Sequence, residues 1–204
     1  MAKSDRLKYL EKRIKQLERH LLPKSYSPTG QYTDRQLDMT RAYRLLIHSE
    51  FEAYLEDRAK ETAISAVKKW KASGKPSNVI ISLLAFCYAP AINTPDSIQN
   101  SIKPIPLTKD VVDRVLAAFN TDIKENNGVR ERNILKILYP IGIQSRDLDV
   151  TWLNQMDSFG EGRGDVAHRS IRTQQVPDPK NEKNTVATLM IGIRDLDEKI
   201  NILV

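Results

Sequence analysis

The sequence predicts an all-α fold, and three observations lead to this prediction. Apolar residues recur at the spacings of three and four that place them on one face of a helix. No stretch shows the strict alternation of apolar and polar residues between turn residues that is typical of half-buried strands. Glycines and prolines gather at a few positions and leave long uninterrupted segments between them. We expect a helical bundle over residues 34–204 with a long central helix, preceded by a helical extension over residues 1–22.

The N-terminal extension is expected to be a helix with a narrow apolar seam flanked by lysine and arginine. Because the helix is short, it is not expected to form a stable coiled coil by itself. The seam therefore either packs on the same chain or forms a dimer contact. The helix is followed by a loop over residues 22–32, which contains Pro23, Pro28 and Gly30. The seam consists of Leu7, Leu10, Ile14, Leu17 and Leu21.

The longest expected helix begins after Thr33, an N-cap whose capping-box partner is Gln36, and continues until Gly74. Its charged residues lie mostly on the opposite face from its apolar ones. His48 lies within this helix, and we expect it to be structural or at the surface, since no second ligand or base is spaced to join it. The apolar positions are Leu37, Leu45, Ile47, Phe51, Tyr54, Leu55, Ile64, Val67 and Trp70.

The rest of the sequence predicts further helices, which are separated by segments rich in proline, glycine or asparagine. A short helix from Asn78 to about Tyr88 is apolar enough to be buried nearly all round, and four prolines make residues 89–107 irregular. Asp157 is a candidate second N-cap within the apolar stretch that follows Asp149. A polar loop is expected over residues 174–184. The other helices are expected from Thr108 to the turn at Asn126-Asn127-Gly128, over Arg130–Tyr139 and over Thr185–Ile202.

Composition excludes several classes of protein. A chain of 204 residues with 40% hydrophobic and 28% charged residues has the balance of a folded globular domain and is not biased toward disorder. No apolar run is long enough to span a bilayer and the N-terminus does not resemble a signal peptide, so we expect a cytoplasmic protein that does not contact membranes. The net charge of +6 favours encounter with a polyanion such as RNA or DNA.

The sequence shows no pattern for a metal or cofactor. Cys87 is the sole cysteine and has apolar neighbours, which indicates a buried structural thiol. The three histidines, His20, His48 and His168, are too widely spaced to suggest a metal site. Phosphate-binding loops, dinucleotide fingerprints, zinc-protease motifs and nucleophile elbows are all absent from the sequence. We therefore expect catalysis, if any, to use side chains alone.

The segment Gly162-Arg163-Gly164-Asp165-Val166-Ala167-His168-Arg169 holds the most suggestive pair of residues. The guanidinium group of Arg163 is permanently charged and its fork matches the oxygens of a phosphate. His168 can accept and donate protons near neutral pH. Together they have the chemistry needed to cleave RNA without a metal. A surface helix would also produce such a pair by accident.

Arg163 and His168 come late in a helical chain, after an apolar stretch with Trp152, Leu153 and Phe159, and this arrangement resembles the HEPN superfamily of RNases. The chain is most similar to the RiboL-PSP-HEPN and MAE-type branches, in which a long acidic and aromatic helix precedes an Arg-x4-6-His motif. That helix would be the one that contains residues 50–55. The resemblance covers residues 34–202, and its specific part is segment 162–169.

The resemblance implies a metal-independent endoribonuclease or an RNA-binding relative. It also implies a homodimer whose two motifs face a shared cleft, often as a toxin or antiviral defence component with an antitoxin or other partner protein. The residue after the arginine, frequently Asn, Asp or His in the superfamily, is Gly164 here, so Asp165 is the candidate orienting residue. Arg169 and Arg172 are candidates for binding flanking phosphates, or are solvated surface charges.

The spacing of the pair limits how it can act. Residues five apart on a regular helix are separated by about 140° and roughly 7.5 Å along the axis, so they do not share a face. Either the arginine side chain curls round, or the helix is irregular near Gly162 and Gly164, or the site combines residues of two subunits; we expect a combination of the last two. Two other functions stay open: a non-catalytic helical module that binds RNA or a protein, and a structural dimer joined through the leucine seam.

Overall fold

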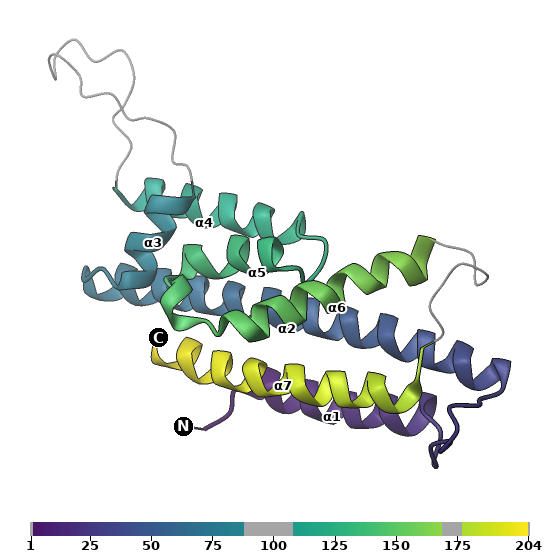
Figure 1. The fold of residues 1–204 in the computed structure, drawn as a ribbon. Helices are drawn as coiled ribbons and strands as arrows, with labels where there is room; N and C mark the ends of the chain where they lie inside the picture. Colours follow the sequence, from purple (N-terminus) through teal and green to yellow (C-terminus); the bar gives the residue numbers. More distant parts are fainter. Residues whose placement is uncertain (1, 88–107, 169–176, 204) are drawn as a thin grey trace, which may run out of the picture.

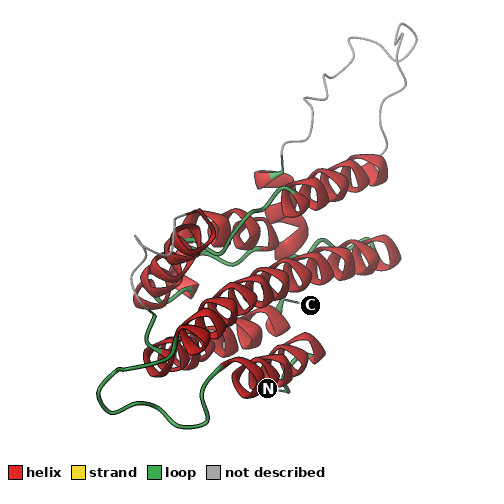
Figure 2. Cartoon of the chain, turned by 90° about the vertical axis from the view of Figure 1, so that its right-hand side faces the viewer, coloured by secondary structure: helices red, strands yellow, loops and turns green. Residues whose placement is uncertain are grey.

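The computed structural model describes residues 2–87, 108–168 and 177–203, and of residues 163–168 it describes the backbone only. Within these ranges every regular element is a helix, so the all-α prediction is confirmed (Figures 1 and 2). Short 3-10 turns over Tyr139–Ile141 and Ser145–Asp147 join α5 to α6. The α-helices are α1 (Asp5–Leu21), α2 (Asp34–Ser73), α3 (Asn78–Phe86), α4 (Thr108–Lys124), α5 (Glu131–Leu138), α6 (Val150–His168) and α7 (Pro179–Ile202).

Helix α2 is the axis of the molecule and contacts each of the other described α-helices. Both of its ends are where the sequence predicted them. The Thr33 hydroxyl accepts a hydrogen bond from the Gln36 backbone N–H, and the Gln36 side chain accepts one from the Thr33 N–H at 2.9 Å. Gly74 ends the helix in the left-handed conformation with φ of 69°. In Figure 1, α1 and α7 lie on one side of α2, and α4 and α5 lie on the other.

The leucine seam of α1 is covered by the same chain. Its residues Leu7, Leu10, Ile14 and Leu17 are buried, and α1 packs along α2 and contacts α7. These side chains belong to one continuous hydrophobic core together with the apolar face of α2. The seam is thus unavailable to a second subunit, which removes the structural dimer joined through it. Burial of such leucines contributes about 1.5–3 kcal/mol each, which is sufficient reason for their spacing.

A buried carboxylate ties the N-terminus, α2 and α7 together. Asp197 of α7 is fully buried and accepts hydrogen bonds from the Tyr54 hydroxyl at 2.9 Å and the Arg58 Nε at 3.1 Å. The same carboxylate accepts hydrogen bonds from the backbone N–H and the hydroxyl of Ser4, the N-cap of α1. With the Asn201 amide, which donates at 3.4 Å, five donors offset the loss of hydration that burial of this charge entails.

Several sequence expectations about individual elements are wrong. Helix α3 ends at Phe86 and is exposed along one side, where Ile81, Leu84 and Phe86 face outward, because it lies at an edge of the bundle and packs on α2, α4 and the 3-10 turn Tyr139–Ile141. Ile64 is 43% exposed although it falls among the apolar positions of α2. The segment expected to be irregular, residues 89–107, lies outside the described residues.

The C-terminal helix begins six residues before the predicted Thr185. Asp178 is its N-cap and accepts a hydrogen bond from the Asn181 N–H at 2.8 Å, and Pro179 occupies the first helical position. Proline is favoured at that position because its missing N–H would have no partner there anyway. The two prolines at 177 and 179 suggested a loop as far as Asn184. Pro179 instead begins the helix.

Candidate active site

Helix α6 carries both residues of the candidate catalytic pair. It runs as a continuous α-helix from Val150 to His168, through Gly162 and Gly164. Figure 1 shows its C-terminal end at the same end of the molecule as the beginnings of α2 and α7. The side chains of Arg163, Asp165 and His168 lie outside what the structure describes, and the predicted phosphate contacts Arg169 and Arg172 lie outside the described residues altogether.

The continuity of α6 corrects one expectation about the pair. A break near Gly162 and Gly164 was expected to bring Arg163 and His168 to one face, but the backbone is helical at both glycines. On such a helix the two Cβ positions point about 140° apart. The remaining ways to join the two groups are a long arginine side chain that curls round the helix and a site shared between two subunits.

Phe159 holds the middle of α6 against α2. Its ring is 2% exposed and lies 6.2 Å from the imidazole of His48 in a stacked arrangement and 5.7 Å from the ring of Phe51 in a tilted one. His48 is itself 1% exposed, and its Nδ1 lies 3.8 Å from the Glu52 carboxylate. His48 is therefore enclosed in the contact between the two helices. This agrees with the structural alternative expected from the sequence.

Arg44 lies next to the beginning of the motif. Its guanidinium group is so close to Gly162 that a methyl group there would overlap Nη2. The same group forms an ion pair with Glu182 of α7, with 3.1 Å between Nη1 and Oε1, and its Cζ lies 5.5 Å from the centre of the Phe159 ring. Burial raises the pKa of Glu182, and the charge of Arg44 opposes that rise. Sequence reasoning missed this cluster, because its members are far apart in the chain and match no motif.

Asp157 performs a different task from the predicted one. It lies within α6 and does not cap a second helix; its carboxylate binds Arg130 at 3.0 and 3.1 Å in a two-pronged ion pair. The carboxylate also accepts a hydrogen bond from the N–H of Glu131, the first residue of α5, at 3.1 Å. The hydrogen bond and charge of Arg130 lower the pKa of Asp157. Asp157 therefore caps α5 from the neighbouring helix, which the sequence does not reveal.

Three glutamates of α2 bind neighbouring segments of the chain. Glu50 forms an ion pair with Arg13 of α1 at 3.1 Å. Glu52 accepts a hydrogen bond from the Gly128 N–H, and Glu56 accepts one from the Asn126 amide at 2.9 Å, so both hold the turn between α4 and α5. Burial raises the pKa of Glu56. Gly128 adopts φ of 127°, a conformation that other residues rarely adopt.

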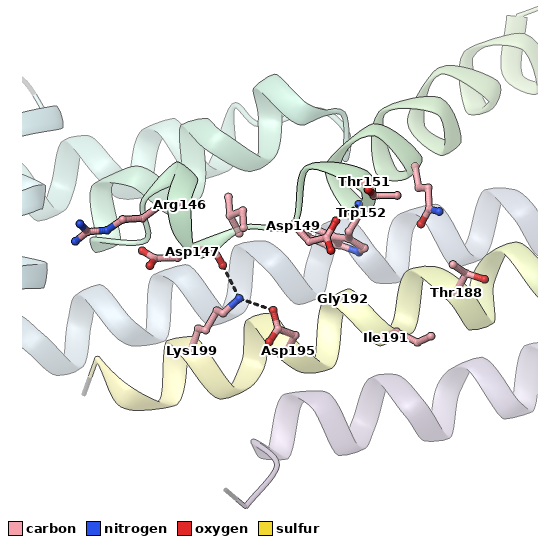
Figure 3. A pocket seen from close by; sticks show the side chains of 12 residues that line it. Arg146, Asp147, Asp149, Thr151, Trp152, Thr188, Ile191, Gly192, Asp195 and Lys199 are labelled. Atoms are coloured by element: carbon pink, nitrogen blue, oxygen red, sulfur yellow. Dashed lines mark hydrogen bonds and ion pairs between the residues drawn. The ribbon is translucent and has the colours of Figure 1, made fainter.

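The hollow shown in Figure 3 is at the other end of α6. It has a volume of about 660 Å³ and lies between the first turns of α6 and the second half of α7. Its one lysine, Lys199, donates hydrogen bonds to Asp195 and to the Asp147 carbonyl, as the dashed lines show. Trp152, in its wall, is eleven residues from Arg163, or roughly 16 Å along the helix axis. The hollow is therefore separate from the motif.

The described residues contain no group of three or more His, Cys, Asp or Glu side chains placed to hold a metal ion. Cys87 is buried, as predicted, and burial raises the pKa of its thiol to about 11. The thiol is therefore protonated at neutral pH and is a poor nucleophile. In the part of the chain that the structure describes, no helix is both long and apolar enough to cross a membrane.

Comparison with family models places the chain in a known family. Residues 8–202 match the RiboL-PSP-HEPN family, so the match includes α1 as well as the bundle around α2. No curated protein and no solved structure gives a significant match. The matched range covers nearly the whole chain, and its all-α architecture agrees with the bundle expected from the resemblance. The chain belongs to the RiboL-PSP-HEPN family of the HEPN superfamily.

Proposed function

We propose that this protein is a metal-independent endoribonuclease that cleaves RNA with Arg163 and His168. The observation that carries the proposal is the placement of this pair in the last turns of α6, in a chain whose family match extends over residues 8–202. HEPN domains are often RNases, and the two side chains supply the chemistry that RNA cleavage requires. The positive net charge of +6 favours binding of a polyanionic substrate.

The chemistry needs no metal because RNA carries its own nucleophile. A base removes the proton of the 2′-hydroxyl, which attacks the adjacent phosphorus, and an acid protonates the departing 5′-oxygen. His168 is suited to the proton transfers. Arg163 is suited to stabilise the additional negative charge of the pentacovalent transition state. The products are a 2′,3′-cyclic phosphate and a 5′-hydroxyl.

A homodimer would solve two difficulties of this mechanism. One imidazole cannot act as base and acid on opposite sides of an in-line displacement at the same time, and a second subunit supplies a second His168. The continuous helix also separates Arg163 from His168 on each chain. In the proposed dimer the motifs of two subunits face a common cleft, with Asp165 orienting His168 or the RNA, and with Arg169 and Arg172 binding flanking phosphates.

The test is incubation of the purified protein with total RNA in EDTA, beside the variant His168→Ala. We expect cleavage by the wild type and a loss of about 100-fold or more in the variant, because general acid–base catalysis contributes that much. A wild type that leaves RNA intact, or a variant that cleaves equally well, would contradict the proposal. A toxin or defence role further predicts that His168→Ala relieves poor growth on expression.

A second candidate function is favoured by one residue. Gly164 stands where many members of the superfamily have a polar residue, so the chain would on this view be a non-catalytic module that binds RNA or a partner protein such as an antitoxin. The same experiment separates the two functions. RNA binding without cleavage, unaffected by His168→Ala, would support the binding module.

A further inference from the structure

Three helices meet at Arg44, immediately before the motif. Arg44 is on α2, Gly162 on α6 and Glu182 on α7. The guanidinium group occupies the space that a side chain at position 162 would need, since its Nη2 and Cζ atoms lie closest to that point. Gly162 therefore permits α6 to approach α2 closely, one residue before Arg163. The approach fixes the distance between the two helices at the turn where the motif begins.

Arg44 is held from two further directions. Glu182 binds Nη1 at 3.1 Å, and the Phe159 ring lies under the guanidinium with 5.5 Å between Cζ and the ring centre. The Arg44 and Glu182 side chains are only 22% and 12% exposed. The attraction between two charges is less screened when they are partly buried, and a cation–π contact is stronger when it is desolvated. The guanidinium therefore has little freedom to leave its place under α6.

The pair is nevertheless incompletely satisfied. Within the described part of the chain, Arg44 Nε and Glu182 Oε2 are buried and form no hydrogen bond. A buried polar atom without a hydrogen-bond partner destabilises a fold. By contrast, the Arg130 and Asp157 pair, which does hold α6, is bidentate, and its side chains are 42% and 31% exposed. Buried atoms without hydrogen-bond partners cost stability, so joining α2 to α7 is not a sufficient reason for the Arg44 and Glu182 pair.

We propose that Arg44 is a positioning residue for the Arg163 and His168 pair, acting through Gly162. The guanidinium group is held by Glu182 and Phe159. It determines the distance between α6 and α2 at the helical turn that precedes Arg163. It thereby fixes the direction in which the following helical turn presents both residues of the pair. This inference rests on the proposed ribonuclease function for its kinetic consequence, but its structural consequence is measurable without any RNA cleavage.

The kinetic experiment compares Arg44→Met with the control Arg130→Met. Each variant removes one ion pair and one arginine that contacts α6, Arg44 through Gly162 and Phe159 and Arg130 through Asp157, and methionine keeps much of the apolar stem. For Arg44→Met we expect kcat to fall about 10- to 100-fold, because small displacements of catalytic groups have effects of this size, with KM changed by less than about twofold. Arg130→Met should lose thermal stability but keep kcat within about twofold of the wild type. Equal kcat values for the two variants would overturn the inference.

Gly162→Ala tests the link through the glycine. The added methyl group should push the guanidinium aside and lower kcat as Arg44→Met does. In the Arg44→Met background the same substitution should have little further effect, since residues that act as a unit have non-additive effects. Additive losses would overturn the inference. If Arg44→Met does not fold, Glu182→Gln replaces it in this experiment, because it removes the charge that holds Arg44 and keeps the shape of the side chain. It should also lower kcat and leave KM unchanged.

Hydrogen exchange separates failure of this inference from failure of the proposed function. We expect the backbone amides of residues 162–168 to exchange faster in Arg44→Met than in both Arg130→Met and the wild type. If the wild type cleaves no RNA, the ribonuclease proposal fails, while faster exchange confined to this segment still supports the positioning role. Unchanged exchange at residues 162–168 in Arg44→Met would overturn it, whether or not the protein is active.

Discussion

At the residue scale, close approaches at glycines explain how α6 is packed. Gly162 admits the guanidinium group of Arg44, and Gly192 of α7 admits the indole ring of Trp152. The Trp152 Nε1 donates a hydrogen bond to the Leu189 carbonyl at 3.0 Å, so the ring is fixed at both its apolar face and its polar edge. Neither glycine is needed for a turn. Each is needed because another side chain occupies the space of its missing Cβ.

Gly192→Ala should therefore destabilise the protein by about 1–3 kcal/mol, as overpacking of a filled core does. Urea unfolding followed by circular dichroism would measure the loss. The neighbouring substitution Ile191→Ala is a control on the same helix, because Ile191 is 66% exposed and its truncation should change stability by less than about 0.5 kcal/mol. A Gly192→Ala variant as stable as the wild type would show that the ring does not pack as described.

At the scale of elements, the ends of helices depend on caps that come from inside and outside the helix. The ends of α2 were predictable, because each is determined locally: Thr33 and Gln36 cap its start, and the Gly74 N–H donates to the Trp70 carbonyl at its end. The start of α5 was not predictable in the same way, since its cap is Asp157 of α6. Local caps leave a pattern in the sequence, whereas a cap donated by another helix does not.

Asp197 is fully buried and connects the N-terminus, α2 and α7, so its removal should be costly. Asp197→Asn keeps the size of the side chain but leaves Arg58 without its buried counter-charge, so we expect a loss of about 3–5 kcal/mol in the free energy of unfolding. Asp195→Asn, which breaks an exposed pair with Lys199 on the same helix, should lose less than about 1 kcal/mol. Similar losses in the two variants, measured by urea unfolding, would contradict the role assigned to Asp197.

The sequence predicted more of the fold than of the site. Helical periodicity and local caps were enough to predict the all-α class, the seam of α1 and the extent of α2. Apolar character alone did not reveal which side of α3 lies at an edge of the bundle, because that depends on which helices surround it. The contact between Arg44 and Glu182 joins residues 138 positions apart, and neither residue belongs to a recognisable motif.

At the scale of the whole molecule, the proposed mechanism calls for two subunits, since one His168 cannot act as base and acid at the same time. The seam of α1 is buried within the chain and does not provide the contact between them. We infer that the subunits meet near the C-terminal end of α6, where a second His168 would complete the acid–base pair. Specific activity per chain should then fall on dilution as the dimer dissociates, in parallel with the dimer fraction from analytical ultracentrifugation at the same concentrations. A monomer that keeps full activity would contradict the shared site.

In the proposed mechanism His168 assists attack of the 2′-hydroxyl on the phosphorus, and a single 2′-deoxy substitution in the RNA tests this step. An RNA oligonucleotide that the protein cleaves at one position is compared, in EDTA, with the same oligonucleotide carrying a single 2′-deoxy residue on the 5′ side of that position. We predict that the all-ribose strand is cut to a 2′,3′-cyclic phosphate and a 5′-hydroxyl, that the substituted strand stays intact there, and that His168→Ala cuts neither. Cleavage of the substituted strand at the same position would contradict the account.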